Sequence, residues 1–261
     1  MPLLTLTRHG SPTDLPTLLI AHGLFGSGRN WGAIAKRLSD SREVIAVDMR
    51  NHANSFWDDD HSYPAMAADL AAVIGTEGHP MDVLGHSMGG KAAMLLALTR
   101  PDRVCRLVVA DIAPVAYPHS QNHLIDAMRG LDLTGLDSRM EADRRLSASV
   151  QDAGVRAFLL QSLDLRATPP RWRLNLDALE RRMTATTGWI DDSALTPFDK
   201  PALFLTGALS DYVKAQDRAH IRALFPQAKM AKIPGAGHWL HAEKPREFEA
   251  ALRVFLGPLG A

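Results

Sequence analysis

The chain has 261 residues, 46% of them hydrophobic and 22% charged, which excludes wholesale disorder and is ordinary for a domain with its own core. The 29 Lys and Arg balance the 29 Asp and Glu, so the net charge gives no reason to expect nucleic acid or an anionic membrane surface as a partner. The single cysteine, Cys105, excludes an intramolecular disulfide, and no apolar run resembles a membrane span or a signal peptide, so we expect a cytoplasmic protein without a membrane span.

The first half of the chain alternates short apolar runs with helical patterns. Strands are predicted at residues 17–21, 44–47, 81–84 and 104–112, and helices at residues 30–38, 63–74 and 87–99. Each strand is almost continuously apolar, and a helix separates it from the next. This order predicts an α/β fold with a mostly parallel sheet flanked by helices.

The pattern changes between residues 114 and 196. This stretch contains no convincing strand, and amphipathic helices are predicted at residues 124–131, 144–163 and 174–184. The alternation then resumes with strands at 202–206 and 229–233 and helices at 217–225 and 245–256. We therefore expect an α/β core made of residues 1–113 and 197–261, with residues 114–196 inserted as a helical cap.

The sharpest chemical signal is the G-x-S-x-G motif at residues 85–89, directly after a predicted strand and directly before a predicted helix. In this context the motif predicts a nucleophile elbow, a tight turn that holds the Ser87 hydroxyl above the edge of the sheet. Glycines are needed in such a turn because it leaves no room for neighbouring side chains. Ser87 is therefore the predicted nucleophile.

A serine hydroxyl needs a base, and His238 is the best placed of the 11 histidines. It lies in the loop between the last predicted strand and the last predicted helix, and the order Ser, acid, His is the one this architecture uses. The histidines His22, His52, His86 and His241 are expected to make structural hydrogen bonds instead.

Two aspartates compete for the role of orienting the His238 imidazole. Asp111 ends an apolar strand, where an unpaired carboxylate would be costly to bury and a histidine partner would explain it. Asp211 follows the strand at 202–206, but one residue beyond the usual spacing from Gly207. We favour Asp111, with Ser210 as a further hydrogen-bonding group, and Asp211 remains the alternative.

An oxyanion hole needs two backbone N–H groups aimed at the developing negative charge. One is expected from Met88, and the other from the Gly-rich turn at residues 22–27, with Leu24 preferred over Phe25. Phe25 and Trp239 are candidates to line the substrate pocket. The motifs of nucleotide-phosphate loops and of zinc sites are absent from the sequence, so neither a metal nor a cofactor is predicted.

With these residues assembled, the chain resembles the alpha/beta-hydrolase superfamily, and within it most closely the YbfF-like esterases. The segments that carry the resemblance are HGLFGSGRNW (22–31), VDMRNHANS (47–55), LGHSMGGKAAM (84–94), DIAPV (111–115) and GAGHWLHAEKP (235–245). The resemblance implies an esterase or thioesterase with a helical lid after the sixth strand, and it favours Asp111 because the branch often carries a serine like Ser210. The chain departs from the branch by having Asp211, and by having Ala53 and Asn54 where related chains often have glycine.

The resulting hypothesis is a serine hydrolase that cleaves carboxylic esters or acyl thioesters through a Ser87–His238–Asp111 triad and an acyl-enzyme. The expected partner is a small-molecule acyl substrate, and the expected state is a monomer or homodimer. Two alternatives remain open. The same triad can support non-hydrolytic chemistry or C–C bond cleavage, and the fold can serve as a ligand-binding module that keeps a slow triad.

Overall fold

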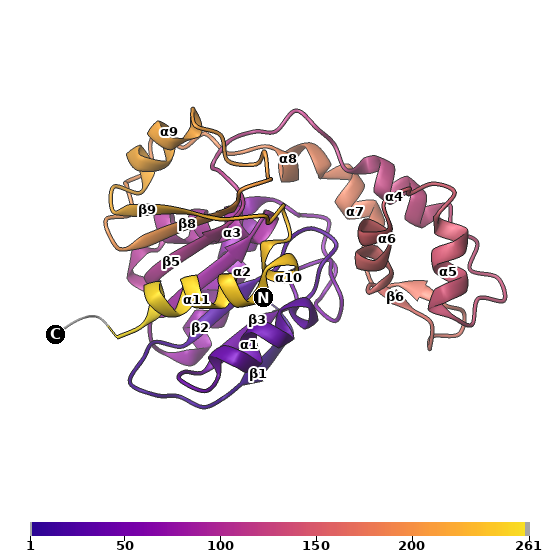
Figure 1. The fold of residues 1–261 in the computed structure, drawn as a ribbon, viewed down its shortest axis with the longest axis horizontal. Coiled ribbons are helices and arrows are strands. Elements are labelled where there is room, and N and C mark those ends of the chain that lie inside the picture. Colours follow the sequence, from indigo (N-terminus) through magenta and orange to yellow (C-terminus); the bar gives the residue numbers. More distant parts are fainter. Residues whose placement is uncertain (1, 259–261) are drawn as a thin grey trace.

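The computed structural model describes residues 2–258, and its centre is a seven-stranded sheet with the strand order β1-β3-β2-β4-β5-β8-β9 (Figure 1). The strands are β1 (Leu6–His9), β2 (Leu18–Ala21), β3 (Val44–Val47), β4 (Met81–His86), β5 (Val104–Ala110), β8 (Ala202–Gly207) and β9 (Ala228–Ile233). Strand β1 runs antiparallel to β3, and all other neighbours in this sheet are parallel.

The strand order reverses beside β2. From β2 the chain crosses to β3 on one side and then to β4 on the other, where Ala21 lies opposite Gly85. Open α/β sheets bind ligands outside the carboxyl ends of the strands at such a reversal. The turn after β2 and the turn after β4 are therefore brought side by side at the point where a site is expected.

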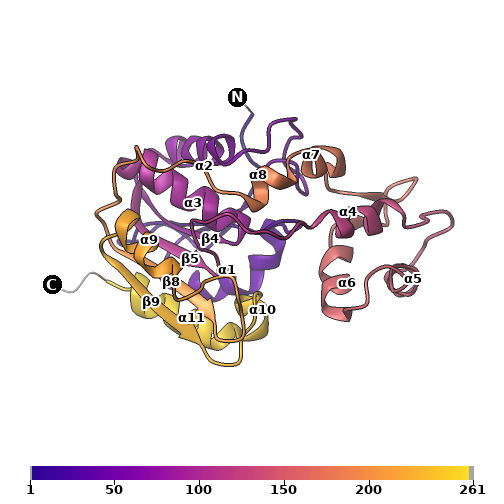
Figure 2. The ribbon, with the colours of Figure 1, turned by 90° about the horizontal axis from the view of Figure 1, so that it is seen from above.

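Helices cover both faces of the sheet (Figure 2). The apolar cluster on one face includes residues of α2 (Tyr63–Glu77), α3 (Met88–Thr99) and α9 (Asp217–Leu224). The cluster on the other face includes residues of α1 (Gly32–Leu38), α10 (Leu240–Glu243) and α11 (Pro245–Leu256). Two 3-10 turns, η1 (Gly28–Trp31) and η2 (Pro101–Arg103), complete this part of the chain. The predicted mostly parallel sheet flanked by helices is confirmed.

The chain between β5 and β8 forms a smaller, mainly helical unit beside the sheet, as Figure 1 shows. Its elements are α4 (Asn122–Arg129), α5 (Arg139–Leu146), α6 (Ala153–Leu160), β6 (Leu163–Asp164), β7 (Arg171–Trp172), α7 (Leu176–Arg181) and α8 (Met183–Thr187). These elements share an apolar cluster of their own, which also takes in Phe25 from the turn after β2. The cap function expected for residues 114–196 stays a prediction.

The structure corrects several sequence expectations. Residues 114–196 do contain strands, because β6 and β7 pair as a short antiparallel ladder. The single helix expected at 144–163 is wrong: α5 ends at Leu146, and α6 begins after Asp152, whose side chain caps it by accepting from the Val155 N–H at 2.9 Å. The insertion follows the fifth described strand and not the sixth, since four strands precede β5 within residues 2–258.

None of the helices that the structure describes has both the length and the apolar character needed to cross a bilayer.

Candidate active site

Ser87 lies in the turn between β4 and α3 with φ 51° and ψ −119°, a left-handed conformation that is unusual for a serine. The glycines around it are required by close backbone approaches. A Cβ atom at position 85 would lie 2.2 Å from the Gly89 carbonyl oxygen, and one at position 89 would lie 2.4 Å from the Ala21 carbonyl oxygen. The G-x-S-x-G segment therefore folds as a strained elbow at the end of β4.

Asp111 and His238 meet beside this elbow. Asp111 directly follows β5 and is completely buried, and its Oδ2 atom accepts a hydrogen bond from Nδ1 of His238 at 2.7 Å. Its Oδ1 atom accepts from the Gly207 N–H at 2.9 Å, and the Ser210 hydroxyl donates to Oδ2. Because Nδ1 of the neutral ring carries the proton, Nε2 is left with its lone pair and can act as a base.

The structure does not bring Asp211 to this cluster. Asp211 is exposed on the turn after β8, whereas its neighbour Ser210 donates to Asp111. The next residue, Tyr212, stacks on the His238 ring with the centroids 4.0 Å apart and an interplanar angle of 19°. The turn after β8 thus holds Asp111 and His238 in place through Ser210 and Tyr212.

The Gly-rich turn after β2 lies against the elbow. A Cβ atom at Gly23 would lie 3.2 Å from the Ser87 Cβ atom and 2.9 Å from Nδ1 of His86. The Phe25 N–H donates to Nε2 of His52 at 3.1 Å, so it is already engaged. Within residues 2–258 the N–H groups of Leu24 and Met88 have no acceptor from the protein. These two amides therefore remain free to bind a ligand oxygen.

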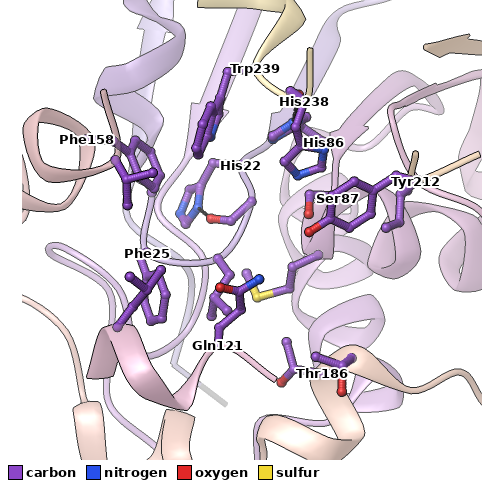
Figure 3. A pocket seen from close by; sticks show the side chains of 18 of the residues that line it. His22, Phe25, His86, Ser87, Gln121, Phe158, Thr186, Tyr212, His238 and Trp239 are labelled. Atoms are coloured by element: carbon purple, nitrogen blue, oxygen red, sulfur yellow. Dashed lines mark hydrogen bonds between the residues drawn. The ribbon is translucent and has the colours of Figure 1, made fainter. Parts of the chain in front are cut away.

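A cavity of about 430 Å³ opens above Ser87, between the sheet edge and the unit that contains α4 to α8. Figure 3 shows Phe25, Phe158 and Trp239 on one side of it, and Ser87, His238 and Tyr212 on the other. The Phe158 ring, from α6, contacts the Trp239 ring at 5.7 Å between centroids. One wall of the cavity is thus aromatic and is contributed by both units.

His86, next to the nucleophile, is held neutral. Burial lowers the pKa of His86 well below its usual value, and the neighbouring His238 and His241 rings lower it further. Its Nε2 atom lies 2.9 Å from the His238 carbonyl oxygen, to which it donates. His86 thereby fixes the backbone of the His238 loop, which agrees with the structural role expected for it.

Lys91, one helical turn after Ser87, also lines the cavity. Its Nζ atom donates to the carbonyl oxygens of Thr187 and Gly188 at the end of α8, and it lies 4.7 Å from the centre of the Tyr117 ring. Burial lowers the pKa of Lys91 to about 7. Lys91 therefore links the core helix that follows the elbow to the inserted unit.

Sequence reasoning missed Tyr212, Phe158 and Lys91 as members of the site. Tyr212 and Phe158 reach it through contacts between distant segments, and nothing in their local sequence signals this. Lys91 could have been identified from the sequence, because a lysine within the apolar helix after the elbow needs polar partners when it is buried.

Comparison with known proteins agrees with this geometry. Residues 16–245 match the family model described as the alpha/beta hydrolase fold. The chain is 41% identical to the sn-1-specific diacylglycerol lipase ABHD11 of Mus musculus, over 93% of this chain and 81% of that protein. It is 38% identical to esterase YbfF of Escherichia coli K12, over 96% of both chains.

A solved structure described as a marine microorganism esterase superposes with a TM-score of 0.91 at 38% identity, and the match covers 98% of this chain and all of that one. The relatives named here are esterases and a lipase. The chain therefore belongs to the alpha/beta-hydrolase family, as a hydrolase of the carboxylesterase type.

Proposed function

We propose that Ser87, His238 and Asp111 form the catalytic triad of an ester hydrolase. The observation that carries the proposal is their arrangement: Ser87 and His238 line one cavity, and Asp111 accepts the hydrogen bond from the buried side of the His238 ring. Nε2 of His238 takes the proton of the Ser87 hydroxyl as Oγ attacks the acyl carbon. The same proton then goes to the leaving alcohol, and water releases the acid from the acyl-enzyme by the same route.

The N–H groups of Leu24 and Met88 bind the oxyanion that forms on the acyl carbonyl. Their freedom from protein acceptors and their position beside Ser87 support this assignment. Phe25, the second candidate of the sequence analysis, is less suited because its N–H is bonded to His52. Preorganised donors of this kind act where charge develops in the transition state and so raise kcat.

The substrate is a carboxylic ester with an apolar acyl chain. The aromatic wall formed by Phe25, Phe158 and Trp239 suits such a chain, and one relative is named for its action on diacylglycerol. Residues 114–196 act as a cap, because Phe158 from α6 closes over the cavity against Trp239. Acyl thioesters share the attacked carbonyl and belong to the same substrate class.

The test is steady-state hydrolysis of p-nitrophenyl esters from acetyl to palmitoyl, with a thioester of the preferred acyl chain alongside. We expect turnover by the wild type and its loss in Ser87→Ala. Ser149→Ala is the matched control, since Ser149 also lines the cavity but has no histidine partner in the proposal. Hydrolysis that survives in Ser87→Ala, or that is lost equally in Ser149→Ala, would contradict the proposal.

A further inference from the structure

Two buried histidines connect the turn after β2 to the turn after β3 in a reciprocal way. His22, from the first turn, accepts the Met49 N–H of the second at 2.9 Å through Nε2. His52, from the second turn, accepts the Phe25 N–H of the first at 3.1 Å through Nε2. The two rings lie edge to face with their centroids 5.1 Å apart. Each turn is thus held by a side chain of the other.

The hydrogen bonds fix the protonation state of both rings. Nδ1 of His22 lies 2.8 Å from the Gly23 carbonyl oxygen, and Nδ1 of His52 lies 2.8 Å from the Arg50 carbonyl oxygen. A carbonyl oxygen can only accept, so Nδ1 carries the hydrogen in each ring and Nε2 is the acceptor. In agreement, burial lowers the pKa of His52 to about 3 and that of His22 to about 4. Both rings are neutral in the working range of an esterase.

These contacts act on the peptide units around the Leu24 N–H. The Gly23 carbonyl belongs to the same peptide unit as the Leu24 N–H and points the opposite way in a trans peptide. That carbonyl is held by His22 and by the Gly26 N–H at 3.0 Å, which leaves the Leu24 N–H facing away from both. The orientation of this donor is therefore set by the bonds to the other end of its peptide.

The next peptide unit needs support because Phe25 has φ 64°, in the left-handed region that bulky residues avoid. His52 accepts the Phe25 N–H, and the Ser162 hydroxyl of the inserted unit donates to the Phe25 carbonyl oxygen, in the peptide unit that follows, at 2.9 Å. The backbone of His52 is itself held by the inserted unit, through an antiparallel β-bridge to Leu174. Without the His52 acceptor, Phe25 would keep a strained backbone and a buried N–H with no partner.

We propose that His52 is a positioning residue for the oxyanion hole: by accepting the Phe25 N–H it keeps the turn in the conformation that presents the Leu24 N–H to the substrate. This inference rests on the proposed function of Ser87 and of the Leu24 and Met88 amides. His52 does not touch the substrate. It acts through the backbone, so its removal affects the transition state more than the bound ester.

The experiment compares His52→Asn with His52→Gln. The Gln side chain carries its amide oxygen about as far from the backbone as Nε2 of His52 and can accept the Phe25 N–H, whereas the Asn side chain is too short. His61→Asn is the matched control, because His61 is buried beside His52, with centroids 5.6 Å apart, and makes no hydrogen bond to the turn after β2. Ser162→Ala removes the donor to the Phe25 carbonyl oxygen, which lies in the following peptide unit.

The probes are p-nitrophenyl butyrate and 1,1,1-trifluoropentan-2-one. In the inhibitor complex Ser87 Oγ bonds to the ketone carbon, the π electrons move to the oxygen as an oxyanion, and the serine proton passes to His238.

We expect His52→Asn to lower kcat by about 10- to 100-fold, part of the roughly 100- to 1,000-fold cost of losing a donor outright. The Ki of the ketone should rise by a similar factor while KM changes little. His52→Gln should restore most of both losses, and His61→Asn should leave both unchanged.

Three results distinguish a positioning role of His52 from a merely structural one, and from a failure of the proposed function. Unchanged kcat and Ki in His52→Asn, with only a lower Tm, would overturn the inference and leave the proposed function intact. If His52→Asn does not fold, His52→Met decides, because its side chain fills similar space without a strong acceptor for the Phe25 N–H: a fall in kcat and a rise in Ki at constant KM support the inference, and wild-type values overturn it. Hydrolysis that survives in Ser87→Ala would instead overturn the proposed function, and the inference with it.

Discussion

Nδ1 of His238 lies 2.7 Å from Oδ2 of Asp111, although 127 residues separate the two in the chain. The Asp111 carboxylate is fully buried, and it also accepts from the Gly207 N–H and the Ser210 hydroxyl. A buried carboxylate is stable only with such partners. Asp111 itself has φ 51°, a conformation that aspartate tolerates better than most residues and that turns the chain out of β5 toward the histidine.

The first prediction concerns this carboxylate. Asp111→Asn should lower kcat by about 10,000-fold, as the equivalent change does in a serine protease, because the amide favours the wrong tautomer of the histidine. KM should change little, since Asp111 does not line the cavity. The measurement is kcat and KM for p-nitrophenyl butyrate.

Asp211→Asn is the matched control. Asp211 is exposed and makes no hydrogen bond to His238, so we expect nearly wild-type kcat. Equal effects of the two substitutions, or a larger effect at Asp211, would contradict the assignment of Asp111.

The second prediction concerns Ser210. Ser210→Ala removes one donor from Asp111 and should lower kcat by about tenfold, since a hydrogen bond to a charged group is worth about 1.5 kcal/mol at the low end. The effect should vanish when Asp111 is already Asn, because both changes act through the same carboxylate. A double-mutant cycle in kcat checks this, and fully additive losses would show that Ser210 acts elsewhere.

The third prediction concerns the pH dependence of stability at Lys91. Burial lowers the pKa of Lys91 from 10.5 to about 7, so between these values the unfolded chain binds a proton that the folded chain does not. Stability then rises with pH across this window, by at most about 1.4 kcal/mol per pH unit, and the full cost of burying the ammonium is present below pH 7.

Lys91→Met removes the titrating amine and with it this pH dependence of stability. We therefore expect the free energy of unfolding of the wild type, measured in urea, to rise relative to that of Lys91→Met as the pH rises from 7 to 10. A constant difference across this range would mean that the carbonyls of Thr187 and Gly188 and the Tyr117 ring fully offset the burial of the charge.

The fourth prediction concerns Ala53, in the turn after β3. Ala53 has φ 47°, in the left-handed region that favours glycine. The left-handed conformation costs alanine about 1–2 kcal/mol, and the extra freedom of glycine in the unfolded chain costs about 0.5–1 kcal/mol. Ala53→Gly should therefore raise the free energy of unfolding by about 0.5–1 kcal/mol at unchanged kcat. A lower Tm for this variant would show that the turn gains nothing from glycine.

The main sheet could be predicted from the sequence because its strands are short apolar runs that differ clearly from the helices between them. Strand β1 could not, since it is a partly exposed edge strand of sequence LTRH without an apolar run. The break between α5 and α6 was also missed. Leu146 and Val150 keep a helical spacing of buried apolar residues across the break, whereas residues 147–152 are not helical and Asp152 caps the start of α6.

The motifs of the candidate site can be read from the sequence, but the sequence does not decide which of two competing residues takes a given role. Asp111 and Asp211 both follow strands, and the geometry of the turn after β8 determines that Ser210, and not Asp211, contacts the Asp111–His238 pair, by donating to Asp111. Leu24 and Phe25 are adjacent, and His52, 27 residues beyond Phe25, determines which N–H is already engaged. Such choices depend on contacts between distant segments, which a local pattern does not contain.

The central claim is that Ser87 is the nucleophile of an acyl-enzyme mechanism, and labelling with an alkyl fluorophosphonate tests it most directly. In this reaction Ser87 Oγ bonds to phosphorus, fluoride leaves, and the serine proton passes to His238. Intact-protein mass spectrometry should find one adduct per chain in step with loss of esterase activity. Peptide mapping should place it on Ser87, and the adduct should be absent from Ser87→Ala. An adduct on another residue, or full activity in the labelled protein, would contradict the account.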